Sequence, residues 1–287
     1  MKRKIPLFVF LLSGCLLFYA CGKNIDDGGK KETTLSPAPT GGESEEPDLT
    51  KEPEPTKEPE ISLTPAKDEL ESRPETEEYL AKEGDAEVFV SKISYPVFTG
   101  GKADTDALNA FVESLIEEFR AYLPEAEEGA RLDYEDFGES GLIAFPESAE
   151  FTITVVGETK EWISIHSTWY GYGGGPHPNT YCKAYVRKKA DGSEVSIEEY
   201  LEQYRLTPEE VADYAAEQVR AVAEEDMFWD EEGLPDSFLR ILKENQWYFT
   251  DEGIVLFADP YELAAYVYGK IECKISYEVL RQGLKNQ

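Results

Sequence analysis

Histidine is scarce in this sequence, and its scarcity limits the chemistry that the chain can perform. The 287 residues include two histidines, His166 in an alternating run and His177 in a glycine-rich segment, and neither has a second histidine beside it at metal-ligand spacing. A metal-dependent hydrolase needs several convergent His and carboxylate ligands, and a serine nucleophile elbow of the G-x-S-x-G kind is missing too. We therefore predict no catalytic residue, no metal and no cofactor, and we interpret the chain as a protein other than an enzyme.

Basic residues are also few, because 28 Lys and Arg stand against 59 Asp and Glu and leave a formal net charge of −31. Nucleic acids and anionic surfaces are poor partners for such a field. A cationic partner would be attracted quickly and in a salt-dependent way, although the same charge also favours solubility alone. Any two of the many acids could pair for glycoside cleavage, so an unrecognised cell-wall hydrolase is kept as an alternative.

A long apolar run occurs once, from Ile5 to Ala20, directly after Lys2, Arg3 and Lys4. A permanent membrane-spanning helix needs about 20 apolar residues. A charged start followed by a shorter apolar run predicts an export signal instead.

Cysteine occurs four times in the chain, and two of the four lie in or just after this signal. A lipoprotein signal ends with an aliphatic residue, two small residues and the cysteine that becomes acylated. Leu12-Ser13-Gly14-Cys15 fits this pattern well, whereas Phe18-Tyr19-Ala20-Cys21 fits less well but is followed at once by the polar stretch that begins at Gly22. We favour lipid attachment at Cys21, with Cys15 as the alternative and an ordinary secretory signal as a second one. Two acyl chains would anchor the protein stably at the extracytoplasmic face of the cell membrane.

Residues 22–85 are predicted to form a disordered tether. Large apolar residues are almost absent from this segment, and Lys51–Glu60 is nearly a repeat of Lys, Glu, Pro and Thr. Such a sequence cannot bury enough apolar surface to offset its chain entropy, and its prolines and like charges keep it extended.

Residues 86–287 are predicted to fold as one α+β domain with a mainly antiparallel sheet and a few packed helices, with two subdomains, about 86–160 and 161–287, as a variant. Alternating apolar residues predict strands at 87–96, 151–156, 161–166, 181–186, 247–250, 254–257 and 270–276. Capping residues and helical spacing predict helices that begin near residues 104, 196 and 207, and a short helix at 237–244. Strand runs interrupted by isolated helices are typical of the α+β class.

Two further cysteines, Cys182 and Cys273, each lie in a predicted strand among apolar neighbours. Outside the membrane they could form a disulfide bond. Two buried free thiols are an equal alternative, because only the geometry of the fold decides between them.

A glycine-rich segment holds most of the candidate binding residues. The run from Trp169 to Asn179 reads WYGYGGGPHPN. It lacks the Lys and Ser/Thr of a phosphate-binding loop, so its glycines indicate a tight turn. Aromatic and proline side chains on a constrained loop suit recognition of a ligand, with packing against the sheet as the alternative. The candidates are Trp169, Tyr170, Tyr172, Pro176, His177 and Pro178.

This segment, the following Asp191-Gly192 turn and the block Tyr261–Gly269 together resemble one family, the extracytoplasmic domain of RsiV-type anti-sigma factors. That domain is shared with the non-catalytic N-terminal region of PdaC-type polysaccharide deacetylases. The glycine-rich segment is similar to the family's Y-x-G-G-x-H-x-N element, and the block that begins at Tyr261 is similar to its closing segment, so Tyr261 joins the candidates. The resemblance extends over residues 87–280.

The resemblance implies a cell-surface sensing or binding domain, and in RsiV-type proteins the ligand is lysozyme. The four residues before the apolar run leave no room for a cytoplasmic sigma-binding part, and the short tail after Leu280 leaves none for a deacetylase domain. We therefore expect a membrane-anchored surface lipoprotein whose acidic domain binds lysozyme or another cationic or cell-wall-related partner. A structural or accessory envelope lipoprotein is the alternative.

Overall fold

The computed structural model describes residues 70–101, 103–138 and 140–285. The predicted signal with Cys15 and Cys21, and residues 22–69 of the predicted tether, lie outside these ranges. No helix within the described ranges is both long and apolar enough to cross a membrane.

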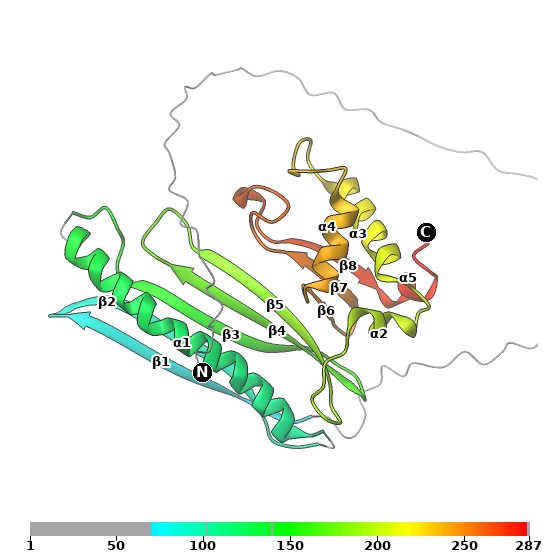
Figure 1. Ribbon diagram of the computed structural model, residues 1–287, viewed down its shortest axis with the longest axis horizontal. Helices are drawn as coiled ribbons and strands as arrows, with labels where there is room; N and C mark the ends of the chain where they lie inside the picture. The colour runs from blue at the N-terminus through cyan, green and yellow to red at the C-terminus, as the bar shows by residue number, and fades with distance from the viewer. Residues whose placement is uncertain (1–69, 102, 139, 286–287) are drawn as a thin grey trace, which may run out of the picture. The chain divides into compact units, whose positions relative to one another are not determined.

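A five-stranded sheet forms the N-terminal half of the fold, with the strands in sequence order (Figure 1). The strands are β1 (Ser72–Glu83), β2 (Ala86–Phe98), β3 (Glu147–Glu158), β4 (Trp162–Tyr172) and β5 (Asn179–Lys188). Neighbours pair antiparallel except β2 and β3, which are parallel. A parallel pair needs a long crossover, and helix α1 (Thr105–Phe137) provides it.

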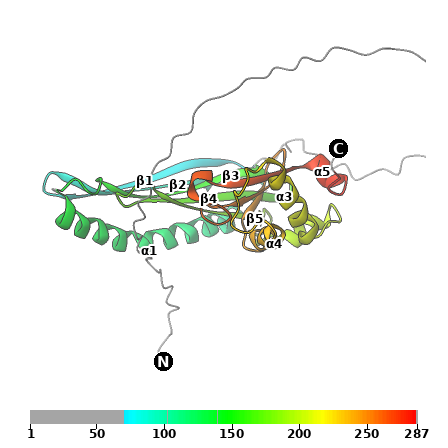
Figure 2. The ribbon, with the colours of Figure 1, turned by 90° about the horizontal axis from the view of Figure 1, so that it is seen from above.

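Helix α1 covers one face of this sheet (Figure 2). It begins where predicted, because Asp104 Oδ1 accepts a hydrogen bond from Ala107 N at 3.0 Å. Its apolar side chains recur every three or four residues and are buried against β2 and β3, as an amphipathic helix requires. The fully buried members are Leu108, Ile116, Phe119 and Ala130.

A second sheet of three antiparallel strands carries its own helices. It consists of β6 (Trp247–Phe249), β7 (Gly253–Ala258) and β8 (Ile271–Ser276), and around it lie α2 (Ile197–Glu202), α3 (Pro208–Val222), α4 (Leu234–Lys243), the 3₁₀ turn η1 (Tyr266–Tyr268) and α5 (Tyr277–Arg281). The predicted capping box at the start of α3 is present, with Thr207 and Glu210 bonded reciprocally. Every residue of β7 is buried, because its alternate side chains pack on two sides.

The two sheets contact each other directly. Phe249 N donates to Ser164 Oγ at 3.2 Å, and Cys182 N donates to Asp259 Oδ2 at 2.8 Å. A Cβ on Gly157 would lie 2.2 Å from Phe249 O, so this close approach requires glycine. A subdomain boundary at residue 160 is wrong, because it would cut the β3–β4 hairpin; the change of sheet comes after Lys188.

The α+β class with a mainly antiparallel sheet is confirmed, but the tether was predicted too long. Residues 72–83 form β1, at the edge of the first sheet, and not disordered chain. Few of its residues are buried, and ion pairs supplement the backbone ladder: Lys92 with Glu78 at 3.3 Å, and Arg120 with Glu77. An edge strand exposed to solvent is often charged, so its composition is like that of a linker.

Candidate binding surface

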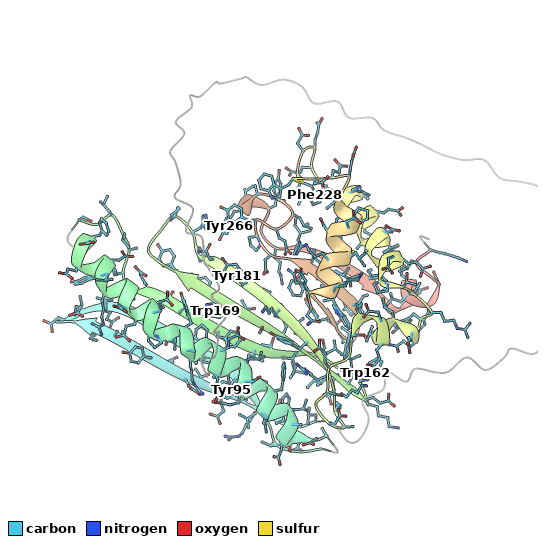
Figure 3. All side chains as sticks on the ribbon, in the orientation of Figure 1. Tyr95, Trp162, Trp169, Tyr181, Phe228 and Tyr266 are labelled. Atoms are coloured by element: carbon cyan, nitrogen blue, oxygen red, sulfur yellow. The ribbon has the colours of Figure 1, made fainter. Side chains whose placement is uncertain are left out.

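Three aromatic side chains from two segments that are distant in the sequence meet in the structure. His177, in the β4–β5 turn, stacks on Tyr266 with ring centroids 3.9 Å apart and planes 18° from parallel. His177 Nε2 lies 3.2 Å from the hydroxyl of Tyr261, and the Tyr261 and Tyr266 centroids are 5.5 Å apart. We call His177, Tyr261 and Tyr266 the aromatic cluster; Figure 3 labels Tyr266 within the segment between β7 and β8.

The segment that carries the two tyrosines is held by one carboxylate. Glu262 accepts hydrogen bonds from Asp259 N at 2.9 Å, from Gln246 Nε2 at 2.6 Å and from Arg240 Nη2 at 2.8 Å. Its neighbour Tyr261 has a φ of 71°, a conformation uncommon for residues other than glycine, yet its side chain remains 54% exposed. The contacts of Glu262 therefore keep a left-handed residue and its exposed ring in place.

A third segment, the α3–α4 connection, lies against this one. Trp229 N donates to Leu263 O at 3.0 Å, and Phe228 forms a β-bridge with Ala264. The Trp229 side chain is 64% exposed. Residues 223–233 contain six acids and no Lys or Arg: Glu224, Glu225, Asp226, Asp230, Glu231 and Glu232. We call residues 224–232 the acidic loop.

The structure separates the predicted candidates into two groups. His177 and Tyr261, both predicted candidates, are in contact. The candidate Pro178 is next to them, because its carbonyl oxygen lies 3.0 Å from His177 Nδ1. The candidate Pro176 is exposed. Neither Tyr266 nor Trp229 was among the predicted site residues. The available signal was a tryptophan inside a stretch that contains acids but no bases.

Trp169, Tyr170 and Tyr172 lie in strand β4 and not in a loop, which corrects the prediction. Because a strand alternates its faces, Trp169 points toward α1 while the two tyrosines point to the other face. The Trp169 ring lies 4.9 Å from the rings of both Phe119 and Tyr122. Trp169 therefore packs against the hydrophobic core between α1 and the five-stranded sheet. Packing of this kind was the alternative to ligand recognition.

Cys182 and Cys273 are both buried free thiols. They belong to different hydrophobic clusters, Cys182 with Phe257 and Cys273 with the packing around α3 and α4. Of the two alternatives left by the sequence, the structure has the unbonded one.

The other histidine, His166, lies in β4 and is not part of the aromatic cluster. Its ring packs between the two sheets. Its ring centroid is 5.3 Å from that of Tyr248 and 5.4 Å from that of Phe257. Burial, and to a smaller extent the charge of Lys270, lower the pKa of His166 to about 4, while the charge of Glu272 acts in the opposite direction. Among the described residues no group of three or more His, Cys, Asp and Glu could hold a metal ion.

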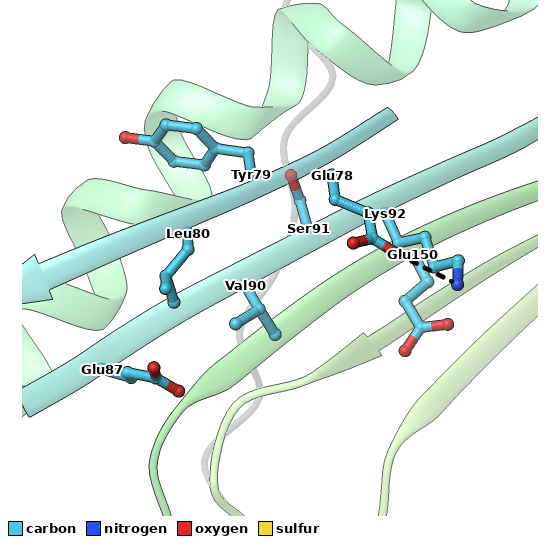
Figure 4. Close-up of a pocket in the computed structure, with 8 residues that line it drawn as sticks. All are labelled: Glu78, Tyr79, Leu80, Glu87, Val90, Ser91, Lys92 and Glu150. Carbon is cyan, nitrogen blue, oxygen red and sulfur yellow. Dashed lines mark ion pairs between the residues drawn. The ribbon is translucent and has the colours of Figure 1, made fainter. Parts of the chain in front are cut away.

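A shallow hollow of about 400 Å³ lies on the face of β1, β2 and β3 (Figure 4). Acidic, basic and apolar side chains line it, among them the Glu78–Lys92 ion pair. None of the predicted candidates lies in its wall. The lining residues are Glu78, Tyr79, Leu80, Glu87, Val90, Ser91, Lys92 and Glu150.

Two family models match successive parts of the chain. Residues 82–180 match the family described as Deacetylase PdaC, and residues 200–278 match the family described as Protein of unknown function (DUF3298). The predicted family resemblance is confirmed. The PdaC match lies on the first sheet and the DUF3298 match on the second, and together they indicate an extracytoplasmic protein associated with the cell envelope.

Solved structures of the DUF3298 family resemble this fold. A member from Bacteroides fragilis NCTC 9343 is 16% identical, with 76% of this chain and 94% of that chain covered and a TM-score of 0.54. A member from Pseudomonas aeruginosa PAO1 is 19% identical, with 75% and 94% covered and a TM-score of 0.44. No curated protein matches the sequence. The first likeness supports the fold, and the function is argued from the residues.

Proposed function

We propose that the protein is a lipid-anchored binding protein of the cell envelope, without catalytic activity of its own, whose acidic domain captures a cationic partner. The charged start, the short apolar run and the cysteines near its end support export and acylation. The net charge of −31 supports a partner of opposite sign. The resemblance to RsiV-type domains makes lysozyme the first partner to test.

One observation carries the proposal: exposed aromatic rings and a run of six carboxylates occupy adjoining segments. Trp229 stands in the acidic loop, and that loop is bonded to the segment bearing Tyr261 and Tyr266. Aromatic side chains and charges of one sign suit a partner rich in Lys and Arg, because ring faces attract cations as carboxylates do. The long-range field would accelerate encounter, and the rings would supply most of the contact energy.

The contacts of the aromatic cluster also favour binding over catalysis. Nδ1 and Nε2 of His177 lie against Pro178 O and the Tyr261 hydroxyl, and its ring stacks on Tyr266, so within the described part of the chain its contacts include no Ser or Cys nucleophile. A general base needs a substrate proton within hydrogen-bond reach. The histidine instead fixes the two tyrosines.

The test is equilibrium binding of the full-length chain to lysozyme by calorimetry at low and high salt. We expect affinity to fall steeply with ionic strength, since exposed charges are screened beyond about 10 Å at 0.1 M. Trp229→Ala and Tyr261→Ala should each weaken binding by roughly tenfold or more, as for interface hot spots. Tyr181→Ala is the matched control, because Tyr181 is 58% exposed on β5 outside this surface; it should bind as the wild type does.

A paired charge experiment distinguishes a local contact from the general field. Glu231→Gln with Glu232→Gln removes two charges from the acidic loop, and Glu117→Gln with Glu118→Gln removes two exposed charges from α1. The first pair should reduce affinity more than the second. No binding at low salt, or equal losses for the two pairs, would contradict the proposed surface.

The anchor is tested separately by metabolic labelling with a palmitate analogue. Label should enter the wild type and Cys15→Ala but not Cys21→Ala. Label lost in Cys15→Ala alone would move the attachment to that residue, and an unlabelled wild type would remove the anchor from the proposal.

A further inference from the structure

The two sheets have four outer strands, and two of these edges are already covered. On β5, Ala184 N donates to Asn245 O at 2.9 Å, so the segment that precedes β6 lies along this strand. On β6, Phe249 N donates to Ser164 Oγ at 3.2 Å, so the first sheet lies along that strand. The remaining outer strands are β1 in the first sheet and β8 in the second.

The hydrogen bonds around β8 show which of its backbone groups face outward. Tyr277 N donates to Glu252 O at 3.1 Å, so these two residues form a hydrogen-bonded pair next to the β7–β8 ladder. Such pairs alternate with non-hydrogen-bonded pairs along an antiparallel ladder, and the β7–β8 register has no shift. The odd-numbered residues of β8 therefore bond to β7, and the N–H and C=O groups of Glu272 and Lys274 point away from it.

The bonds on the other side of β7 agree with this assignment. Phe257 is the register partner of Glu272, and it donates its N–H to Gln246 O at 3.0 Å, away from β8. Among the described residues no hydrogen bond reaches the backbone of Glu272 or Lys274. Figure 1 shows β8 on the side of the second sheet that faces away from β5. The outer edge of β8 is thus open to a further strand.

Charge distinguishes this edge from that of β1. Four of the 12 residues of β1 are glutamates, and the strand includes Pro74, which has no N–H. Like charges and proline discourage a second strand from pairing at an edge. In β8, by contrast, Glu272 and Lys274 carry opposite charges and stand between apolar residues. The order Ile-Glu-Cys-Lys-Ile over residues 271–275 is complementary to itself when a second copy runs antiparallel.

The charges also select a register. Because the outward backbone groups belong to even-numbered residues, only these can form hydrogen-bonded pairs with a second β8. Two such registers overlap over five residues of the strand. A pairing centred on Cys273 places each Glu272 opposite Lys274 of the second copy. A pairing centred on Lys274 places the two lysines opposite each other, which is unfavourable. The first register is therefore preferred.

We propose that the edge of β8 is a dimerisation site, at which a second copy of this chain continues the second sheet by antiparallel β8–β8 pairing centred on Cys273. The contact is isologous, as in a two-fold symmetric dimer. It contains two hydrogen-bonded pairs, and each pair exchanges both of its N–H···O bonds. This association goes beyond the proposed binding function and does not depend on it.

Side chains on both faces of the extended sheet suit this pairing. Successive residues of a strand point to opposite faces, so Glu272 and Lys274 lie on the face away from Cys273. The Lys274 side chain is 71% exposed, and its ammonium lies 3.7 Å from Glu272 of its own chain, so it can turn to the second copy at little cost. On the other face, Ile271 lies opposite Ile275 of the second copy, and apolar cross-strand pairs are favourable.

The experiment is sedimentation equilibrium of the full-length chain over a range of concentrations. Each copy carries a net charge of −31, so we choose about 0.15 M salt, at which repulsion is screened beyond about 8 Å. The wild type should show a reversible monomer–dimer equilibrium. Lys274→Glu places like charges opposite each other in both pairs and should weaken dimerisation by roughly tenfold or more. Lys183→Glu makes the same change of charge at an exposed position of β5 and should dimerise as the wild type does.

Mixing two variants separates the pairing from a general loss of stability. Glu272→Lys should also dimerise weakly, because lysines then face each other in both pairs. In a mixture of Lys274→Glu with Glu272→Lys, each pair again joins opposite charges, so a heterodimer should form with about the wild-type affinity. A variant that is merely damaged would not be rescued by mixing.

Two further measurements test the backbone pairing and its register. Lys274→Pro removes an N–H that points away from β7, so it leaves the chain's own ladder intact while blocking a second strand; urea unfolding should show a folded monomer. A carbodiimide joins an amine directly to a carboxylate. Applied to mixed ¹⁴N and ¹⁵N chains of the wild type, it should give a Lys274–Glu272 crosslink that contains both isotopes.

A wild type that stays monomeric, or a mixture that dimerises no better than its components, would overturn the proposal. Where Glu272→Lys fails to fold, Lys274→Pro decides the matter, because a dimer as tight as that of the wild type must use another surface. These measurements require no lysozyme, so they stand apart from the test of the binding function.

Discussion

The imidazole of His177 lies nearly parallel to the phenol ring of Tyr266, with centroids 3.9 Å apart and an interplanar angle of 18°. The two residues come from the turn between β4 and β5 and from the segment between β7 and β8, so this contact joins the first sheet to the second. Rings stacked across two segments fix both without a covalent link. The surface they form is held in place before any partner arrives, which lowers the entropic cost of binding.

Two tryptophans should respond in opposite ways to truncation. Trp169→Ala removes a ring that packs on Phe119, Tyr122 and Phe151 and should lower the free energy of unfolding by about 3 kcal/mol, the low end for a core aromatic because Trp169 is only partly buried. Trp229→Ala removes a ring that is 64% exposed and should change stability by less than about 0.5 kcal/mol. Urea unfolding measures both; similar losses for the two variants would contradict the assignment of Trp229 to a free surface.

Local signals predicted most of the secondary structure. Asp104, Ser196 and Thr207 cap helices as expected, since each side-chain oxygen accepts a backbone N–H in the first turn. Alternation located every strand of the second sheet and β2 to β5 of the first. Such signals depend on neighbours within one turn or two residues, so they are readable without the fold.

The remaining features depend on contacts between distant residues. β1 is stabilised by its ladder to β2 and by ion pairs such as Glu77 with Arg120, which is 43 residues away. Tyr266 belongs to the candidate site only because its ring stacks on His177, which lies in a turn 89 residues earlier in the chain. Trp169 was placed in a loop because β4 runs on into the glycine-rich segment, and only the sheet determines where the strand ends.

Glu262 should be a structural requirement of the aromatic cluster. Its side chain is 17% exposed and accepts three hydrogen bonds, two of them from uncharged donors inside the fold. Glu262→Ala leaves those donors without a partner, and we expect a loss of about 1–3 kcal/mol in the free energy of unfolding. Glu244 is the other partner of Arg240, and the Glu244 side chain is 56% exposed. Glu244→Ala should therefore lower the free energy of unfolding by at most about 0.5 kcal/mol. Comparable losses in urea unfolding would mean that Glu262 does not hold the segment.

The two buried thiols should be unreactive in the folded protein. Burial raises the pKa of Cys273 to about 12, and burial together with the nearby Asp259 raises that of Cys182 to about 11. The thiolate is the reactive form, so iodoacetamide at pH 8 should leave both residues unmodified until denaturant is added. Peptide mass spectrometry measures the modification of each site, with and without reductant. A Cys182–Cys273 crosslinked peptide in the unreduced sample would contradict the free-thiol structure.

His166 should make the protein less stable in mild acid. Its pKa is about 4 in the folded chain against an ordinary value of 6.5, chiefly because of burial. Between these values the unfolded chain binds more protons than the folded one, so stability rises with pH across the window and is lost as the pH falls through it. Nε2 of His166 has no hydrogen-bond partner among the described residues, and replacing such a group with an apolar one of similar shape is nearly neutral. His166→Phe should therefore fold normally and lack this acid-dependent loss.

The comparison is best made in a chain that already carries Glu147→Gln, because Glu147 titrates in an overlapping window with the opposite sign. In that background the free energy of unfolding in urea should increase from pH 4 to pH 6.5 when His166 is present and change less when it is phenylalanine. The charges that act on His166 come from Lys270, which lowers its pKa, and Glu272, which raises it. Lys270→Gln should accordingly reduce the acid-dependent loss, because the folded-state pKa of His166 then lies closer to its ordinary value. An identical pH profile with and without His166 would mean that the histidine takes up its proton as easily in the folded protein as in the unfolded chain.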